Sequence, residues 1–359
     1  MPETLWEIAV QQNRTKSVQI GTENTLIFAG NKGSGKSTII NRFLEKDETP
    51  KSTLALDYNF GRKGAGNYHT RVVSHIWELG GGTRLSDLIG VVMTSNNILN
   101  LHLILVIDLS KPEELWDTVD TLLKSASARV DQILNRLHQK NIMRIQNIFG
   151  EKWRNRIPPT HPDIELLNPF PLPLTFLGSK HDLLMTRDTE QQNLICKTIR
   201  FLSHFYGASV YFSSTKEDGI LKRIRAVLNH IAFNGKDITN VQMETGKPLA
   251  IPVGVDSFSN IGTPPHENIE IGRLTANSPL EMWKNIFCSK FPQKSGLALS
   301  LSNITHNLTD PSKDPQYSEP LIDSARKVKD EELESKRRQS ERHMYNLLQQ
   351  ITSEGLIIV

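Results

Sequence analysis

The sequence predicts an α/β fold in which a mostly parallel sheet carries helices on both faces. Between residues 24 and 233, short apolar runs typical of buried strands alternate with segments of helical spacing. A glycine-rich phosphate-binding motif stands between the first such strand and the first such helix. Because strands that alternate with helices pair in parallel and are covered on both faces, these observations favour an open α/β sheet.

The first half of this region contains four predicted strands and one helix. Each strand is a short run of apolar or alternating residues, and the helix places Ile39, Ile40, Phe43 and Leu44 on one side. The expected strands are Thr25–Ala29, Thr53–Phe60, Val72–Leu79 and Leu101–Leu109, and the expected helix is Lys36–Lys46.

The second half is predicted to begin with a long helix, because Pro112 suits a first helical turn and apolar residues then recur at helical spacing to Leu137. Residues 140–172 are polar and rich in proline, which predicts irregular structure. The remaining expected elements are strand Leu174–Leu177, helix Thr189–Tyr206, strand Ala208–Ser213 and helix Asp218–Phe233.

The composition of the sequence changes after Asn234. Residues 245–275 are rich in glycine and proline, and a short amphipathic helix follows with Leu280, Trp283, Ile286 and Phe287. A charged helix is expected over Leu321–Ile351, either free in solution or, through a stripe of Met344, Leu347, Leu348 and Ile351, bound in a partner's groove. We expect an N-terminal segment (1–23), a GTPase-like P-loop domain (24–233), an extension packed on it (234–292), and a flexible tether with the charged helix (293–359).

The composition argues against several classes of protein. The net charge of +3 is small for 359 residues, so a nucleic-acid binder with a basic face is not indicated. The two cysteines, Cys196 and Cys288, form no disulfide framework or CxxC pair, and we see no His/Cys metal cluster in the spacing. With no secretory signal and no apolar run of membrane-spanning length, we expect a soluble protein of the cytoplasm without membrane insertion.

The phosphate-binding motif fits GxxxxGK[ST] at every fixed position. Its glycines allow backbone N–H groups to turn toward phosphate oxygens, Lys36 reaches the terminal phosphates, and the Ser37 hydroxyl binds Mg²⁺. The expected phosphate-site residues are Gly30, Asn31, Lys32, Gly33, Ser34, Gly35, Lys36, Ser37 and Thr38.

Two later segments resemble the guanine-recognition elements of Ras-like GTPases. In Gly178-Ser-Lys-His-Asp182, which resembles NKxD, Asp182 accepts from the guanine edge and Lys180 lies along the base, while Ser179 replaces the usual Asn. Ser214 and Thr215 resemble the SAK element that contacts guanine through its backbone. Their placement after strands is where ligands bind in open α/β sheets. We therefore expect GTP or GDP as the ligand, although a vestigial loop that holds no nucleotide remains an alternative.

A third segment resembles the DxxG switch element, with Glu78 at the acidic position and Gly81 at the glycine. Together with Ser37 and Thr53, which lies 16 residues later, Glu78 forms the candidate Mg²⁺ set. A P-loop ATPase is a rival interpretation, because the apolar strand that ends in Asp108 resembles a Walker B segment whose Asp binds Mg²⁺.

The sequence also indicates weak hydrolysis. Ras-like enzymes place a water-orienting Gln after DxxG, whereas this chain has Gly82. Lys32 stands where those enzymes have a small glycine. We therefore expect no catalytic residues and a nucleotide that acts as a structural ligand; a working regulatory GTPase is the alternative.

The combination of motifs resembles the dynein light intermediate chain family, most closely its cytoplasmic dynein 2 branch. The segments that carry the resemblance are Met1–Ile8, Gly30–Thr38, Pro50–Tyr58, His75–Thr83, Leu105–Pro112, Ser278–Lys284 and Lys313–Tyr317. The resemblance implies a non-motor subunit that binds and stabilises the dynein 2 heavy chain, with the other dynein 2 subunits as partners. It further implies a microtubule motor complex for retrograde intraflagellar transport and cilium assembly, located in the cytoplasm, on the cytoskeleton, and in the cilium and its base.

Overall fold

The computed structural model describes residues 23–64, 71–139, 143–233, 235, 240–265, 278–293 and 319–353. The chain separates into two compact units, Met1–Ser302 and Asn303–Val359, and each is described by itself. The expected N-terminal segment, apart from Glu23, and nearly all of the expected tether lie outside the described residues.

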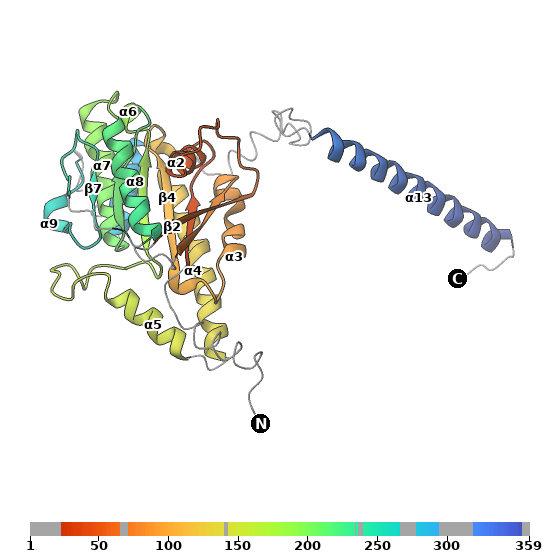
Figure 1. The fold of residues 1–359 in the computed structure, drawn as a ribbon, viewed down its shortest axis with the longest axis horizontal. Coiled ribbons are helices and arrows are strands. Elements are labelled where there is room, and N and C mark those ends of the chain that lie inside the picture. Colours follow the sequence, from red (N-terminus) through yellow and green to blue (C-terminus); the bar gives the residue numbers. More distant parts are fainter. Residues whose placement is uncertain are drawn as a thin grey trace. The chain divides into compact units, whose positions relative to one another are not determined.

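The first unit is built on a seven-stranded sheet in the order β2-β3-β1-β4-β5-β6-β7. Figure 1 labels β2, β4 and β7 of this sheet. The five central strands run parallel, while β2 and β7 pair antiparallel with β3 and β6 at the two edges. This confirms the predicted class of a mostly parallel α/β sheet. The strands are β1 (Glu23–Ala29), β2 (Leu56–Gly64), β3 (Arg71–Leu79), β4 (Leu101–Asp108), β5 (Leu174–Ser179), β6 (Ser209–Phe212) and β7 (Ala250–Ile251).

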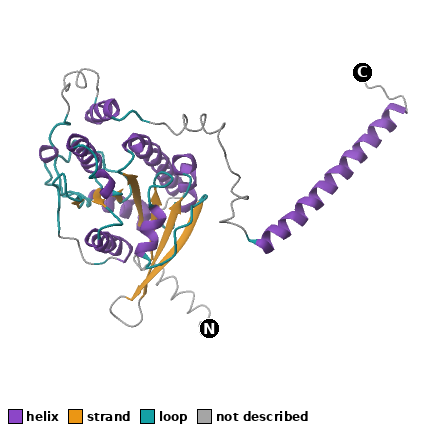
Figure 2. Ribbon diagram, turned by 90° about the horizontal axis from the view of Figure 1, so that it is seen from above, coloured by secondary structure: helices purple, strands orange, loops and turns teal. Residues whose placement is uncertain are grey.

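Helices lie on both faces of this sheet, as Figure 2 shows from above. Those of the first unit are α2 (Lys36–Phe43), η1 (Gly82–Leu88), α3 (Ile89–Val92), η2 (Ile98–Asn100), η3 (Pro112–Glu114), α4 (Leu115–Gln139), α5 (Met143–Arg154), α6 (His181–Leu184), α7 (Thr189–Phe205), α8 (Asp218–Phe233), α9 (Phe258–Ile261) and α11 (Pro279–Lys290).

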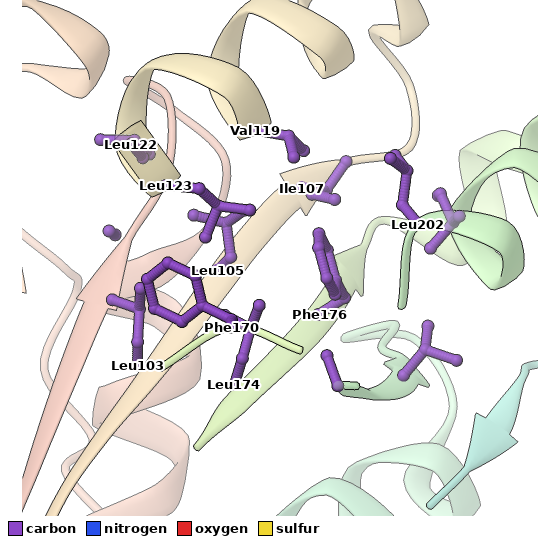
Figure 3. Close-up of a cluster of buried hydrophobic side chains, with 14 of the residues drawn as sticks. Leu103, Leu105, Ile107, Val119, Leu122, Leu123, Phe170, Leu174, Phe176 and Leu202 are labelled. Carbon is purple, nitrogen blue, oxygen red and sulfur yellow. The ribbon is translucent and has the colours of Figure 1, made fainter. Parts of the chain in front are cut away.

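Two hydrophobic cores result, one on each face of the sheet. Alternate residues of β4 enter opposite cores, because successive side chains of a strand point to opposite faces: Leu103, Leu105 and Ile107 enter one, and Ile104 and Val106 the other. In Figure 3 Leu105 lies near Leu123 of α4, Ile107 lies between Val119 of α4 and Leu202 of α7, and Leu103 lies near Phe170. Helices α2 and α8 cover the second core with Ile39, Ile40, Ile224 and Leu228.

Two local predictions were wrong, and one strand was missed. Residues 143–154 form α5 instead of irregular structure, because Phe149 packs against the larger core and Lys152 donates from Nζ to the Leu99 carbonyl at 2.9 Å. Strand β2 begins at Leu56, which leaves Thr53 in the preceding loop. The two-residue strand β7 has no periodic signal of its own and forms through its pairing with β6.

The segments after α8 pack on the face that carries α4 and α7. Trp283 of α11 stacks on Phe201 of α7, with ring centroids 4.9 Å apart. The Gln293 side chain accepts from the Trp116 backbone N–H at 2.9 Å, at the first turn of α4. Apolar packing and one helix-capping bond therefore attach this extension to the sheet domain.

The second unit contains α13 (Pro320–Ser353). Its described side chains, up to Arg342, are exposed and form i,i+4 pairs such as Arg337–Glu341 and Arg338–Glu334. The side chains of the predicted apolar stripe lie outside the description. Within the described residues, no helix is both long enough and apolar enough to span a membrane.

Candidate functional site

The phosphate-binding motif forms the loop between β1 and α2, as its sequence predicted. Gly30, Gly33 and Gly35 adopt φ values of 150°, 77° and 90°, which favour glycine. A Cβ at position 30 would collide with the Val106 carbonyl oxygen, whereas one at position 33 would meet nothing within 4 Å. The loop thus packs tightly on β4 on one side and leaves open space at Gly33, which suits a phosphate group.

Lys36 lies at the centre of this loop and is buried. Its Nζ donates to the carbonyl oxygens of Gly30 and Asn31, at 2.9 Å each. Burial lowers the pKa of Lys36, and the nearby charge of Glu78 opposes that shift. A buried ammonium held only by neutral carbonyls and one carboxylate favours the approach of an anion such as phosphate.

The three candidate Mg²⁺ residues come together beside the loop. Ser37 Oγ donates to Glu78 Oε1 at 2.7 Å, and Thr53 also forms a hydrogen bond with the Glu78 side chain. Burial raises the pKa of Glu78, while the bond from Ser37, the charge of Lys36 and the bond from Thr53 oppose the rise. A hydroxyl that donates its proton to a carboxylate keeps its lone pairs for a metal, so these oxygens fit Mg²⁺.

These residues surround one cavity of about 270 Å³. Three lysines and one carboxylate contribute to its wall, so the charge balance favours an anionic ligand. The lining residues are Lys32, Gly33, Gly35, Lys36, Ser37, Thr38, Pro50, Lys51, Ser52, Thr53, Glu78, Gly80 and Gly81. Four of these residues were not predicted from the sequence, namely Pro50, Lys51, Ser52 and Gly80; their proximity to Thr53 and Gly81 in the chain was the available signal.

The expected guanine-recognition residues do not line this cavity. Ser179 is adjacent to the phosphate loop, since a Cβ at Gly35 would lie 3.8 Å from its Cβ. Asp182 accepts from Ser214 Oγ at 3.0 Å and pairs with Lys216 Nζ at 2.8 Å. The bond from Lys216 is the main reason that the pKa of Asp182 is lowered.

An ionised Asp182 is the form that a guanine edge requires, because guanine presents N–H donors there. A carboxylate offers about four acceptor positions, so about one remains for a base after the bonds from Ser214, Lys216 and the backbone N–H of Asp182 itself. Thr215 lines a separate groove, together with Thr38, between α2 and α8.

Where Ras-like enzymes carry a water-orienting Gln, this chain has Gly82, and the local backbone and packing favour glycine there. Gly82 has a φ of 65°, and a Cβ there would lie 3.0 Å from Asn31 Oδ1 and 3.3 Å from the Lys32 nitrogen. Asn31 is itself fixed, because its Nδ2 donates to Glu114 Oε2 at 2.9 Å and to Thr118 Oγ1 at 2.7 Å. The loop therefore leaves little room for a larger side chain at position 82.

The buried Asp108, proposed as a Walker B residue in the ATPase alternative, is engaged elsewhere. One of its oxygens accepts from the Ser110 backbone N–H at 3.0 Å, and the other pairs with Lys180 Nζ at 2.5 Å. A carboxylate with these partners is not presented to the phosphate cavity, which it does not line.

A second polar cluster, which our sequence analysis missed, joins α7 to its neighbouring segments. Ligand atoms of His161, Asp163 and His204 lie within 4.8 Å of one another, a spacing compatible with a metal. However, His204 Nε2 is bonded to Asp163 Oδ2 at 2.8 Å, and the ring nitrogens of His161 are bonded to the Asp256 carbonyl at 2.9 Å and the Asp163 N–H at 3.1 Å. These bonds favour a structural role for the cluster.

The family model described as "Dynein light intermediate chain (DLIC)" matches residues 2–163. "Cytoplasmic dynein 2 light intermediate chain 1" of Bos taurus is 42% identical over 346 residues, covering 94% of this chain and 96% of the relative. The protein of the same name from Homo sapiens is 41% identical over 345 residues, covering 94% and 96%.

The chain also resembles a solved structure in its fold. It is described as the "Crystal Structure of the Dynein Light Intermediate Chain's Conserved Domain", and it aligns with a TM-score of 0.53 at 14% identity. The alignment covers 79% of this chain and 97% of that chain. At this identity the likeness concerns the fold alone.

Proposed function

This chain belongs to the dynein light intermediate chain family, and on that basis we propose that it is a non-catalytic accessory subunit of the cytoplasmic dynein 2 motor complex. The observation that carries this proposal is the identity of 41–42% to dynein 2 light intermediate chains over 94% of the chain. In this role the chain binds and stabilises the dynein 2 heavy chain, which supplies the force-generating ATPase.

The proposed role places the chain in retrograde intraflagellar transport and in the assembly of cilia. Its expected locations are the cytoplasm, the cytoskeleton, and the cilium with its base. Loss of the chain from a ciliated cell is expected to lower the amount of dynein 2 heavy chain and to slow retrograde particles. Unchanged heavy-chain levels and unchanged retrograde velocity would contradict this role.

For the P-loop domain we propose GTP or GDP as a ligand that stabilises the fold without useful turnover. The support for binding is the Gly33 cradle, the buried Lys36 ammonium and the ionised Asp182. The support for weak hydrolysis is Gly82, whose left-handed backbone and contact with Asn31 oppose a water-orienting Gln. A ligand that binds only the native state raises stability by mass action.

The experiment for this ligand is to purify the full chain, denature it, and identify any released nucleotide by chromatography. Stoichiometric GDP or GTP is the expected result. Release of ADP or ATP would instead favour the ATPase alternative, and a well-folded chain that releases nothing would indicate a vestigial loop. Sustained GTP turnover by the isolated chain would favour the regulatory GTPase.

A further inference from the structure

Asp108 is a buried carboxylate at the end of β4 whose oxygens are occupied by donors from this chain. One oxygen accepts from the Ser110 backbone N–H at 3.0 Å and from its hydroxyl at 2.5 Å. The other faces Lys180 Nζ at 2.5 Å. The Asp108 side chain is 4% exposed and that of Lys180 is 34% exposed, so the ammonium reaches inward from the surface.

The backbone of Lys180 is held in an uncommon conformation. Its φ is 59°, and among the described residues only one other non-glycine residue, Glu45, has a positive φ. Hydrogen bonds on both sides fix it: the Ser179 carbonyl accepts from Leu109 N–H at 3.1 Å, and the His181 N–H donates to the Ser213 carbonyl at 3.0 Å. A strained conformation persists only where its surroundings determine it, and such conformations cluster at functional sites.

This strained residue stands between the two halves of the nucleotide site. Ser179, directly before it, is adjacent to Gly35 of the phosphate loop, and Asp182, two residues later, is the expected base-binding carboxylate. Strand pairing sets Ser179 beside Asp108, so the ends of β4 and β5 bring the acid and the lysine together. The ion pair is therefore located where a bound base would lie.

We propose that Asp108 is a positioning residue of the nucleotide site, which fixes the Lys180 side chain so that it covers the face of the guanine ring. This inference rests on the proposed guanine-nucleotide ligand. A cation held over an aromatic ring is attracted to its face, and a lysine that is already immobilised loses less conformational entropy when the base arrives. The role differs from the Walker B interpretation, in which Asp108 binds a metal.

The test is a double-mutant cycle on the full-length chain, with a fluorescent GDP analogue as the probe. Asp108→Asn and Lys180→Met are each expected to weaken GDP binding about tenfold. If Asp108 acts through Lys180, the double variant binds no more weakly than Lys180→Met. Asp131→Asn, which changes an exposed acid on α4, is the matched control and is expected to leave binding unchanged.

Two further measurements separate positioning from a merely structural or metal-binding role. Lys180→Arg keeps a cation beside Asp108 and is expected to retain GDP affinity within about threefold. If only the packing of the lysine stem mattered, the positive charge of the arginine would not be needed for this retention. The dependence of binding on Mg²⁺ is expected to be the same in Asp108→Asn as in the native chain. A Mg²⁺ dependence that disappears in this variant would identify Asp108 as a metal ligand and overturn the inference.

The outcomes distinguish this inference from the proposal on which it rests. Binding of GDP by the native chain with additive losses, about a hundredfold in the double variant, would overturn the positioning role alone. A native chain that binds no GDP would overturn both the ligand and the positioning role. If Asp108→Asn does not fold, Lys180→Arg and Lys180→Met still test the inference. An equal loss of GDP affinity in these two variants would contradict a role for a positioned cation.

Discussion

Gly82 lies directly against Asn31 of the phosphate loop, so that a Cβ at position 82 would be 3.0 Å from Asn31 Oδ1. The glycine also has a φ of 65°, which side chains rarely adopt. Introducing the Gln of Ras-like enzymes at position 82 is therefore not expected to restore GTP hydrolysis.

We predict that Gly82→Gln does not raise GTP hydrolysis and lowers the free energy of unfolding by about 1–3 kcal/mol. Single-turnover GTP hydrolysis and urea unfolding measure the two effects. Gly82→Ala is the control and is expected to carry most of the destabilisation, because the backbone strain comes with the first carbon. A marked increase in GTP hydrolysis by Gly82→Gln would contradict this prediction and show that the absence of a Gln at position 82 is the main cause of weak hydrolysis.

Replacing Lys36 by Ala is expected to remove the bound nucleotide and to lower the melting temperature at least to that of a nucleotide-free native chain. The buried ammonium is the main positive charge within the loop, and its loss leaves the Gly30 and Asn31 carbonyls without their donor. Chromatography of the denatured protein and calorimetry check these effects. Lys124→Ala, a side chain that is 74% exposed on α4, should change neither.

Asp182→Asn is expected to weaken GDP binding and to improve binding of xanthosine diphosphate. The amide presents an N–H₂ donor where the carboxylate was an acceptor, and xanthine has a carbonyl where guanine has its exocyclic amine. Unpaired polar groups in a binding site cost about 1–3 kcal/mol, or roughly tenfold to a hundredfold in affinity. If the variant weakens both nucleotides equally, Asp182 does not read the base edge.

Acidification is expected to destabilise the first unit through His102. Burial, with smaller effects from the charges of Arg156 and His230, lowers the pKa of His102 to about 3, so the native state keeps this imidazole neutral. The unfolded chain binds the proton near pH 6.5, so the stabilisation is complete above that value and is lost as pH falls below it.

Between pH 7.5 and pH 5.5 this group alone is expected to remove about 1.4 kcal/mol from the free energy of unfolding. Urea unfolding at the two values measures the loss. His102→Gln can still bond with Thr175 Oγ1, which lies 2.8 Å from His102 Nε2, and should show a smaller loss. An unchanged pH dependence in that variant would show that His102 is not responsible.

The segment around α11 is expected to stabilise the sheet domain. Trp283→Ala removes a buried ring that stacks on Phe201 and should cost about 3–5 kcal/mol in the free energy of unfolding. A chain that ends at Ser302, the last residue of the first unit, should keep the native midpoint in urea, whereas one that ends at residue 277 should lose stability. Equal midpoints for the two truncations would contradict this role for α11.

Much of the fold was predictable because its signals are local. The apolar runs of β1, β4 and β5 and the helical spacing of α4, α7 and α8 are visible in the sequence. In contrast, β7 depends on contacts with a distant segment, such as the pairing of Tyr211 with Ala250, and a local pattern does not contain that information. Helix α5 does carry a local signal, because Ile145, Ile148 and Phe149 recur at helical spacing, but the polar and proline-rich sequence around it led to a prediction of irregular structure.

The site shows the same division. The phosphate loop was evident from its spacing, and the structure brings Ser37, Thr53 and Glu78 together as expected. The partner of Asp108 was not evident, because Lys180 is 72 residues away and they meet only through the pairing of β4 with β5. The buried ion pair of Arg200 with Asp256 was also not evident, because these residues are 56 positions apart in the sequence.

The measurement that tests the central claim most directly is co-expression of the full-length chain with the dynein 2 heavy chain, followed by size-exclusion chromatography. The proposed accessory role predicts that the two elute together in a fixed ratio and that the heavy chain expressed alone is less stable in solution. Separate elution at micromolar concentration, with no change in the stability of the heavy chain, would contradict it.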